Sequence, residues 1–218
     1  MHTPPQDTYR VPAGPAAGEF RERGSKFVAA LYPVLSEEEA LAAVDAERLA
    51  HPKCNHHCYA YRLGIGDDRW RANDDGEPSG TAGKPILGQI DKAGLSDVVI
   101  VVSRYYGGTK LGTSGLINAY REAARQALDS VATADRVLTA RVYLSFGYAL
   151  MSPVMGALSQ LGLEMANQDF AETAHVTLEL PRSTVAPTVR ELQAAIAGVY
   201  LEEVDADFTV AGLTISTD

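Results

Sequence analysis

Hydrophobic and polar positions in the first 133 residues follow two periods, and the changes of period predict a mixed α/β unit. Alternation at every second residue predicts strands, whereas apolar residues three and four positions apart predict helices. The strands are predicted at residues 27–33, 54–63 and 97–103, with a short hairpin around 69–71. The helices are predicted at residues 36–50, 81–93 and 114–129. The unbroken aliphatic run at 98–102 is typical of a central strand that is buried on both faces.

From residue 134 onward the pattern changes to strand, helix, two strands, helix and strand, which is typical of a ferredoxin-like βαββαβ domain. The strands are predicted at residues 136–148, 163–170, 175–180 and 201–210. The two predicted helices, at 152–162 and 184–197, can cover one face of an antiparallel sheet with their apolar positions. The fold class is therefore α/β (α+β). We expect a flexible, proline-rich leader at 1–18, an N-terminal domain at 19–133 and a ferredoxin-like domain at 134–218.

Composition and charge narrow the class of protein. The chain has 218 residues, of which 46% are hydrophobic and 22% charged, and this length is sufficient for one large core or two modest cores. No apolar run approaches the roughly 20 residues that span a membrane, no secretory signal pattern is present, and Cys54 and Cys58 cannot form a disulfide framework. We therefore expect a cytoplasmic protein without a membrane partner. The net charge of −9 is concentrated in residues 134–218, with 4 basic and 11 acidic residues, which argues against a non-specific nucleic-acid coat.

The strongest chemical signal is the segment 103–115 (SRYYGGTKLGTSG), between a predicted strand and a predicted helix. Glycines let a ligand approach main-chain N–H groups, and a helix N-terminus favours an anion. The spacing matches neither the nucleotide-triphosphatase loop nor the dinucleotide fingerprint, and a tight structural turn is the alternative. The residues expected to bind phosphate or nucleic acid are Lys84, Arg104, Gly107, Gly108, Lys110, Thr113, Ser114, Arg121 and Arg125.

A second glycine-rich segment, residues 74–85 (DDGEPSGTAGKP), precedes another predicted helix and offers a second anion-binding turn. His56, Asp75 and Glu77 form a candidate polar site, in which the carboxylates could hold Mg²⁺ and the imidazole could move a proton. The alternative is that the acidic residues cap turns and keep the loop soluble. The histidines and cysteines of 51–58 lack the spacing of a zinc site, so we expect no metal and no cofactor.

Residues 74–85 and 104–120 (RYYGGTKLGTSGLINAY) resemble the signature of the YigZ/Impact family. Further positions that agree with this signature are Ser25, Lys26, Phe27, His56, Cys58 and Ala60. The resemblance extends over about residues 20–130, and the C-terminal pattern resembles the smaller domain of bacterial two-domain YigZ-type members, whose fold is shared with the last domain of elongation factor G.

The resemblance implies a two-layer α/β N-terminal domain, like that of a ribosomal small-subunit protein and of translation-factor domains. It also implies a role near translation. Eukaryotic relatives regulate a starvation-responsive kinase of translation initiation by competing for its activator, and bacterial members are described as regulators or nucleic-acid binders. The resemblance supplies no catalytic residue.

Three functions remain open from the sequence. The first is a translation-associated regulator that binds RNA, the ribosome or another phosphate-bearing partner through a glycine-rich basic surface. The second is a Mg²⁺-dependent enzyme acting on a phosphorylated small molecule, which is less expected because no nucleophile or triad pattern is present. The third is a protein-interaction adaptor in translation control, whose acidic C-terminal domain meets a basic protein partner.

Overall fold

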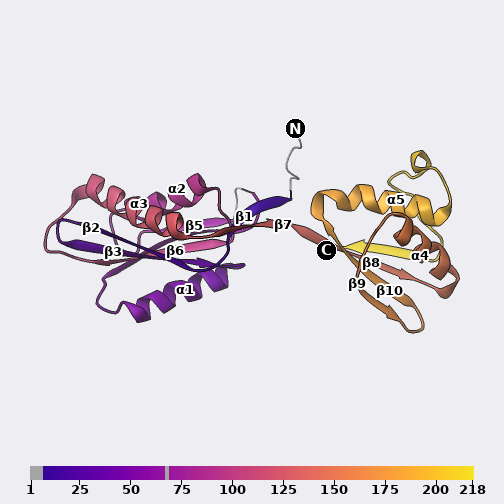
Figure 1. The fold of residues 1–218 in the computed structure, drawn as a ribbon, viewed down its shortest axis with the longest axis horizontal. Helices are drawn as coiled ribbons and strands as arrows, with labels where there is room; N and C mark the ends of the chain where they lie inside the picture. The colour runs from indigo at the N-terminus through magenta and orange to yellow at the C-terminus, as the bar shows by residue number, and fades with distance from the viewer. Residues whose placement is uncertain (1–6, 67–68) are drawn as a thin grey trace. The chain divides into compact units, whose positions relative to one another are not determined.

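The computed structural model describes residues 7–66 and 69–218, which form two compact units (Figure 1). The N-terminal unit is Tyr9–Arg136, and the C-terminal unit is Val137–Asp218 together with residues 7 and 8. The division falls three residues after the 133/134 boundary that the sequence suggests. Within the described residues, no helix is both long and apolar enough to cross a membrane.

The N-terminal unit is built on an antiparallel sheet with the strand order β2-β3-β6-β4-β5. Its strands are β2 Ala16–Glu22, β3 Ser25–Pro33, β4 His56–Arg62, β5 Trp70–Asn73 and β6 Val98–Tyr105. The aliphatic residues of β6 at 98–102 are fully buried. The prediction of a central strand that is covered on both faces is therefore confirmed.

Helices cover both faces of this sheet. In Figure 1, α2 (Gly83–Ala93) and α3 (Gly112–Ser130) lie on one face and α1 (Glu37–Ala50) lies on the other. Two separate groups of buried side chains fill the spaces between the layers, one beneath α2 and α3 and the other beneath α1. The mixed α/β class is confirmed, but this unit has three layers where the family resemblance implies two, because the apolar side chains on both faces of β6 must be covered.

The segment expected to be a flexible leader forms strands in the part that the structure describes. β1 (Thr8–Pro12) pairs with β7 (Thr133–Val137), and β2 begins at Ala16. Val11 is buried, and the Tyr9 hydroxyl donates a hydrogen bond to the Asp97 carboxylate at 2.7 Å. The expectation was wrong for residues 8–18 because these anchoring side chains outweigh the proline and glycine content. Residues 1–6 lie outside the described residues.

The C-terminal unit has the ferredoxin-like order that the sequence predicts. Its antiparallel sheet has the strand order β11-β8-β10-β9, and α4 and α5 pack against each other and against the shared apolar core. The strands are β8 Thr139–Phe146, β9 Met165–Phe170, β10 Ala174–Pro181 and β11 Leu213–Thr217. The helices are α4 Met151–Gln160 and α5 Val185–Ala197, with short 3-10 turns η1 Tyr148–Leu150, η2 Arg182–Thr184 and η3 Leu201–Glu203.

The last strand lies later in the chain than predicted. The segment 201–210 begins with η3 and continues as an irregular loop, and only Leu213–Thr217 pairs with β8. The prediction was wrong because Arg190 of α5 donates hydrogen bonds to the carbonyls of Leu201 and Val204. These carbonyls are therefore satisfied by a side chain and not by a neighbouring strand.

Candidate phosphate-binding site

The two glycine-rich segments meet at one pocket of the N-terminal unit, with a volume of about 460 Å³. The first segment contributes Glu77 and Pro78, and β4 contributes His56. The second segment and the start of α3 contribute Arg104, Tyr106, Lys110, Leu111, Gly112, Thr113 and Leu116. The pocket thus unites residues of the expected phosphate-binding group with His56 and Glu77 of the candidate polar site.

Strand register explains how two of these side chains come together. Antiparallel pairing places His56 of β4 opposite Arg104 of β6, and Arg104 opposite Phe27 of β3. Residues directly opposite each other in antiparallel strands point to the same face, which here is the face covered by α2 and α3. The Arg104 guanidinium lies 5.4 Å from the centre of the Phe27 ring and 5.5 Å from that of Tyr106, within the range of cation–π contacts.

The N-terminus of α3 contributes to the lining of the pocket. Leu111 at the N-cap position makes no side-chain capping hydrogen bond, and no acidic residue occupies the first turn of this helix. The N–H groups of the first turn carry the partial positive charge of the helix dipole. Lys110, which is exposed, and the Thr113 hydroxyl lie at the same end of the helix. This part of the pocket is chemically suited to an anion.

Arg104 is balanced by a buried carboxylate. Its Nη1 donates to Glu77 Oε1 at 2.6 Å, and the two side chains are only 8% and 4% exposed. Tyr120 of α3 donates its hydroxyl to the same oxygen at 2.8 Å. Burial, the Cys58 thiol and the Glu77 carboxylate raise the pKa of Tyr120 well above its usual value, so this hydroxyl stays protonated. Arg104 therefore adds little net charge to the pocket, although its buried Nε has no hydrogen-bond partner among the described residues.

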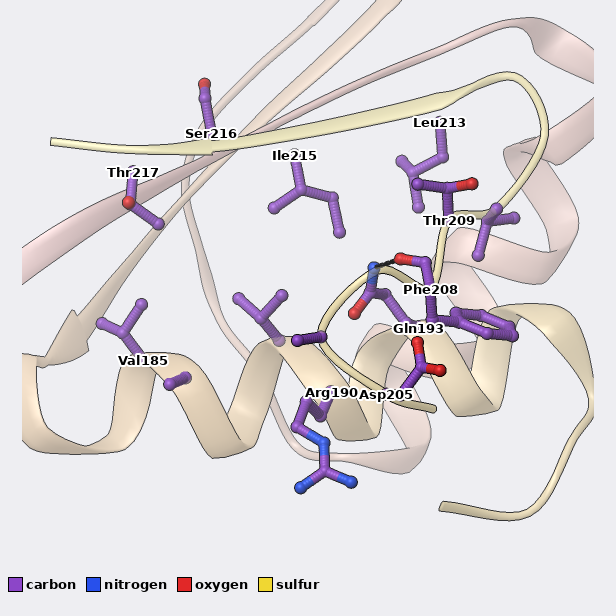
Figure 2. Close-up of a pocket in the computed structure, with 14 residues that line it drawn as sticks. Val185, Arg190, Gln193, Asp205, Phe208, Thr209, Leu213, Ile215, Ser216 and Thr217 are labelled. Atoms are coloured by element: carbon purple, nitrogen blue, oxygen red, sulfur yellow. Dashed lines mark hydrogen bonds between the residues drawn. The ribbon is translucent and has the colours of Figure 1, made fainter. Parts of the chain in front are cut away.

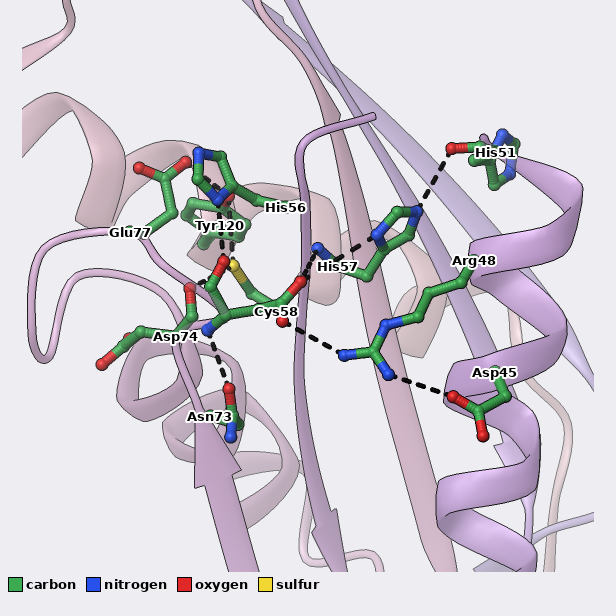
Figure 3. A network of polar contacts seen from close by, with 11 residues as sticks. Asp45, Arg48, His51, His56, His57, Cys58, Asn73, Asp74, Glu77 and Tyr120 are labelled. Atoms are coloured by element: carbon green, nitrogen blue, oxygen red, sulfur yellow. Dashed lines mark hydrogen bonds and ion pairs between the residues drawn. The ribbon is translucent and has the colours of Figure 1, made fainter. Parts of the chain in front are cut away.

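One ring nitrogen of His56 is hydrogen-bonded within the fold, and the other has no hydrogen-bond partner among the described residues. Its Nδ1 lies 2.8 Å from the backbone carbonyl oxygen of Asp75, which can only accept, so Nδ1 is the donor. Figure 3 shows His56 close to Glu77 and Tyr120, with Cys58 beneath them. The Cys58 thiol lies 3.0 Å from the carbonyl oxygen of Asp74 and 3.3 Å from the Tyr120 hydroxyl, so this network joins β4, α3 and the first glycine-rich segment.

The second expected anion-binding turn is already filled by the protein itself. The Asp74 carboxylate accepts hydrogen bonds from the backbone N–H groups of Gly80 (2.7 Å), Ala82 (3.0 Å) and Gly83 (2.8 Å) at the start of α2. Burial acts to raise the pKa of Asp74, but these donors outweigh it and lower the pKa. The expectation of an open anion site at this turn was therefore wrong, and Lys84 is an exposed residue beside an occupied helix end.

Asp75 belongs to a structural clamp and not to the lining of the pocket. Its carboxylate accepts a hydrogen bond from the backbone N–H of His57 at 2.7 Å and pairs with Arg48 of α1 at 3.1 Å. Arg48 also pairs with Asp45, as Figure 3 shows. Asp75 pairs with Arg48 and Glu77 pairs with Arg104, so the two carboxylates do not form the Mg²⁺ site that the sequence suggested as an alternative. Among the described residues, no group of three or more His, Cys, Asp and Glu side chains is arranged to hold a metal ion.

Gly107 and Gly108 of the second glycine-rich segment have different structural roles. A Cβ atom at Gly107 would lie 1.9 Å from the backbone carbon of Gly24, and the Gly107 N–H donates to Ser25 Oγ at 3.1 Å. Gly107 is thus required by the close approach of two backbones, and its N–H is not available to a ligand. Gly108 has a positive φ of 84° and faces open space, so it permits the turn without contacting a neighbour.

The remaining expected binding residues lie along the exposed side of α3. Ser114 is in the first turn, and Arg121 is exposed seven residues later on the same side of the helix. Arg125 is one turn further on and pairs with both Glu122 and Asp129. Its charge is therefore compensated, and neither Arg121 nor Arg125 lines the pocket.

Sequence reasoning missed the polar role of Tyr120. The helical period places Tyr120 within the apolar stripe of α3, where it packs edge-to-face on Phe27 with 5.0 Å between ring centres. Its hydroxyl nevertheless joins Glu77 to Cys58. The only available signal was the hydroxyl itself, because a buried tyrosine generally requires a hydrogen-bond partner.

The C-terminal unit contains a different kind of hollow, shown in Figure 2. It has a volume of about 610 Å³ and lies between α5, β11 and the loop that precedes β11. Val185, Val189 and Ile215 contribute apolar surface, and Gln193 fixes the loop by donating to the carbonyl of Phe208 at 2.9 Å. None of the expected binding residues lies here.

Together, the fold and the pocket define a class: a two-domain α/β protein whose N-terminal unit has an anion-compatible pocket and whose C-terminal unit is ferredoxin-like. The Impact N-terminal domain profile matches residues 23–128. The IMPACT family member YigZ of Escherichia coli (strain K12) is 34% identical over 182 residues, which cover 83% of this chain and 89% of YigZ. The chain belongs to the IMPACT family.

Two further comparisons agree with this assignment. The Protein IMPACT homolog of Saccharomyces cerevisiae is 32% identical over 120 residues, covering 50% of this chain and 46% of that protein. A crystal structure described as that of a hypothetical protein superimposes with a TM-score of 0.66 at 32% identity, covering 85% of this chain and 91% of the other. The similarity to this solved structure therefore extends over both units.

Proposed function

We propose that this protein is a translation-associated regulator whose N-terminal unit binds a phosphate-bearing partner, with single-stranded RNA as the first candidate. The role in translation rests on membership of the IMPACT family. The binding role rests on one observation: the uncapped N-terminus of α3, Lys110 and the buried Arg104 side chain meet at a single pocket. A basic protein partner for the acidic residues 134–218 stays a prediction.

The charges around the pocket favour a local contact over a broad one. Arg104 is neutralised by Glu77, and Arg125 by Glu122 and Asp129. The positive contributions that remain near the second glycine-rich segment are Lys110, the helix dipole and, further along α3, Arg121. One or two phosphates are therefore engaged, not a long stretch of backbone.

The number of phosphates engaged can be tested through the salt dependence of binding. For single-stranded nucleic acid, each neutralised phosphate contributes a slope of about −0.7 to the logarithm of affinity plotted against the logarithm of salt concentration. We expect a slope of about −1 in fluorescence anisotropy titrations of a labelled 12-nucleotide RNA between roughly 50 and 300 mM KCl. Lys110→Ala should weaken binding at every sequence and make the slope shallower by about 0.7.

Arg125→Ala is the matched control, because it removes an exposed cation from the same helix but one whose charge is already paired. We expect it to leave affinity within about twofold of the unmodified protein. Absence of RNA binding, salt-independent binding, or equal losses from Lys110→Ala and Arg125→Ala would contradict the proposal.

A further inference from the structure

The polar groups of the pocket come from two parts of the fold. Lys110, the Thr113 hydroxyl and the N–H groups at the start of α3 are donors. The Glu77 carboxylate and the ring of His56 come from the first glycine-rich segment and from β4. Because Nδ1 of His56 donates to the Asp75 carbonyl, Nε2 of the neutral ring is an acceptor.

This division restricts how an anionic ligand can lie. A phosphate oxygen placed against the Nε2 lone pair and the Glu77 carboxylate would be repelled, so the phosphate belongs beside the start of α3. The His56 ring instead requires a group that donates a hydrogen bond. A hydroxyl carried on the same ligand meets that requirement, and a volume of about 460 Å³ leaves room for a sugar between the two groups.

A second observation points independently to a missing partner. Arg104 lines the pocket with a side chain that is only 8% exposed, and its buried Nε has no hydrogen-bond partner among the described residues. Buried N–H donors are nearly always paired. Tyr106, which is 56% exposed, contacts this guanidinium through its ring and offers a face on which a base or sugar can pack.

We propose that the pocket recognises a ribose phosphate, with the phosphate at the N-terminus of α3 beside Lys110 and the 2′-hydroxyl donating to Nε2 of His56. This inference rests on the proposed phosphate-binding function and adds to it the selection of RNA over DNA. The 2′-hydroxyl is the group by which a protein distinguishes the two nucleic acids at a given position. An RNA strand and a free ribonucleotide share this chemistry.

The experiment compares the ligands first on the unmodified protein. Labelled 12-nucleotide oligo(A), oligo(dA) and 2′-O-methyl oligo(A) are titrated at the same salt concentration. We expect the RNA to bind about 2- to 10-fold more tightly than either analogue, which is the value of one hydrogen bond. Competition with AMP and dAMP distinguishes an RNA strand from a free ribonucleotide as the ligand. If the strand is the ligand, RNA binds more tightly than AMP. If a free ribonucleotide is the ligand, AMP binds as tightly as the RNA strand.

His56→Asn tests the protein side of the contact. The asparagine amide can retain the donor to the Asp75 carbonyl but has no group in place of Nε2. We expect RNA affinity to fall to the level of DNA while DNA affinity stays unchanged. His175→Asn is the control, because His175 is an exposed histidine of β10 in the other unit. We expect no change from it.

The outcomes separate the two proposals. Equal affinities of the unmodified protein for RNA, DNA and 2′-O-methyl RNA would overturn the ribose inference and leave phosphate binding in place. Equal weakening of RNA and DNA binding by His56→Asn, in a protein with unchanged Trp70 fluorescence, would also overturn it. Failure of every ligand to bind would overturn both this inference and the proposed function.

Discussion

The buried pair of Arg104 and Glu77 makes the sharpest prediction about stability. Glu77→Gln preserves the shape of the side chain but leaves the Arg104 charge uncompensated, where the two side chains are 8% and 4% exposed. Removing one partner of a buried ion pair costs about 3–5 kcal/mol, and the glutamine oxygen can still accept one hydrogen bond. We therefore expect the free energy of unfolding to fall by about 3 kcal/mol, and Tm by roughly 10 °C.

The assay can be restricted to the unit that contains the pair. Trp70 is the single tryptophan of the chain and lies on β5, so its fluorescence in urea reports unfolding of the N-terminal unit. Glu122→Gln is the matched control, because Glu122 pairs with Arg125 on the surface of α3, and we expect a loss below about 1 kcal/mol.

Replacing both partners tests the cause of the loss. In Glu77→Gln/Arg104→Met no charge remains buried, so this double variant should be more stable than Glu77→Gln alone. Glu77→Gln should also tighten phosphate binding, because the guanidinium at the pocket is no longer neutralised. The reasoning is refuted if Glu77→Gln costs no more than Glu122→Gln, or if adding Arg104→Met destabilises the protein further.

Three other changes follow from the same structure. Asp74→Ala removes the acceptor of three backbone N–H groups at the start of α2 and should lower the free energy of unfolding by about 2–4 kcal/mol in urea titrations; a loss below 1 kcal/mol would contradict this. Gly107→Ala should prevent folding as judged by circular dichroism, because its Cβ would lie 1.9 Å from a backbone atom. Gly108 faces open space, so Gly108→Ala should lower the free energy of unfolding by only about 1 kcal/mol, which is the cost of its positive φ. Burial lowers the pKa of His57 below 6.5, so just below that pH the unfolded chain binds more protons than the folded chain. The free energy of unfolding should therefore fall from pH 7.5 to 5.5, and His57→Gln should make this pH dependence weaker.

The periodic parts of the fold could be predicted from the sequence because their signals are local. The run at 98–102 indicated a strand covered on both faces, and the Ser36 side chain caps α1, accepting from the Glu39 N–H at 3.1 Å. β1 was missed because its anchors are distant: the Tyr9 hydroxyl binds Asp97, which is 88 positions away in the sequence. The pattern of neighbouring residues in the sequence does not predict a contact between residues this far apart.

The site was predictable in part for the same reason. A glycine-rich loop before a helix indicates an anion-compatible helix start, and such a start is present at α3. Which basic residues keep their charge could not be predicted, because Arg104 is neutralised by Glu77, 27 positions earlier in the chain. Tyr120 completes that network from 43 positions away, so only the folded chain brings the three side chains together.

The two helix N-termini on the same face of the sheet provide an internal comparison. At α2, the Asp74 carboxylate accepts three backbone hydrogen bonds, and its pKa is lowered as a result. At α3, Leu111 at the N-cap position makes no side-chain capping hydrogen bond, although the helix is longer and Lys110 adds a positive charge. The chain therefore satisfies the start of α2 with its own carboxylate. Under the proposed function, the phosphate of a partner takes the corresponding place at the start of α3.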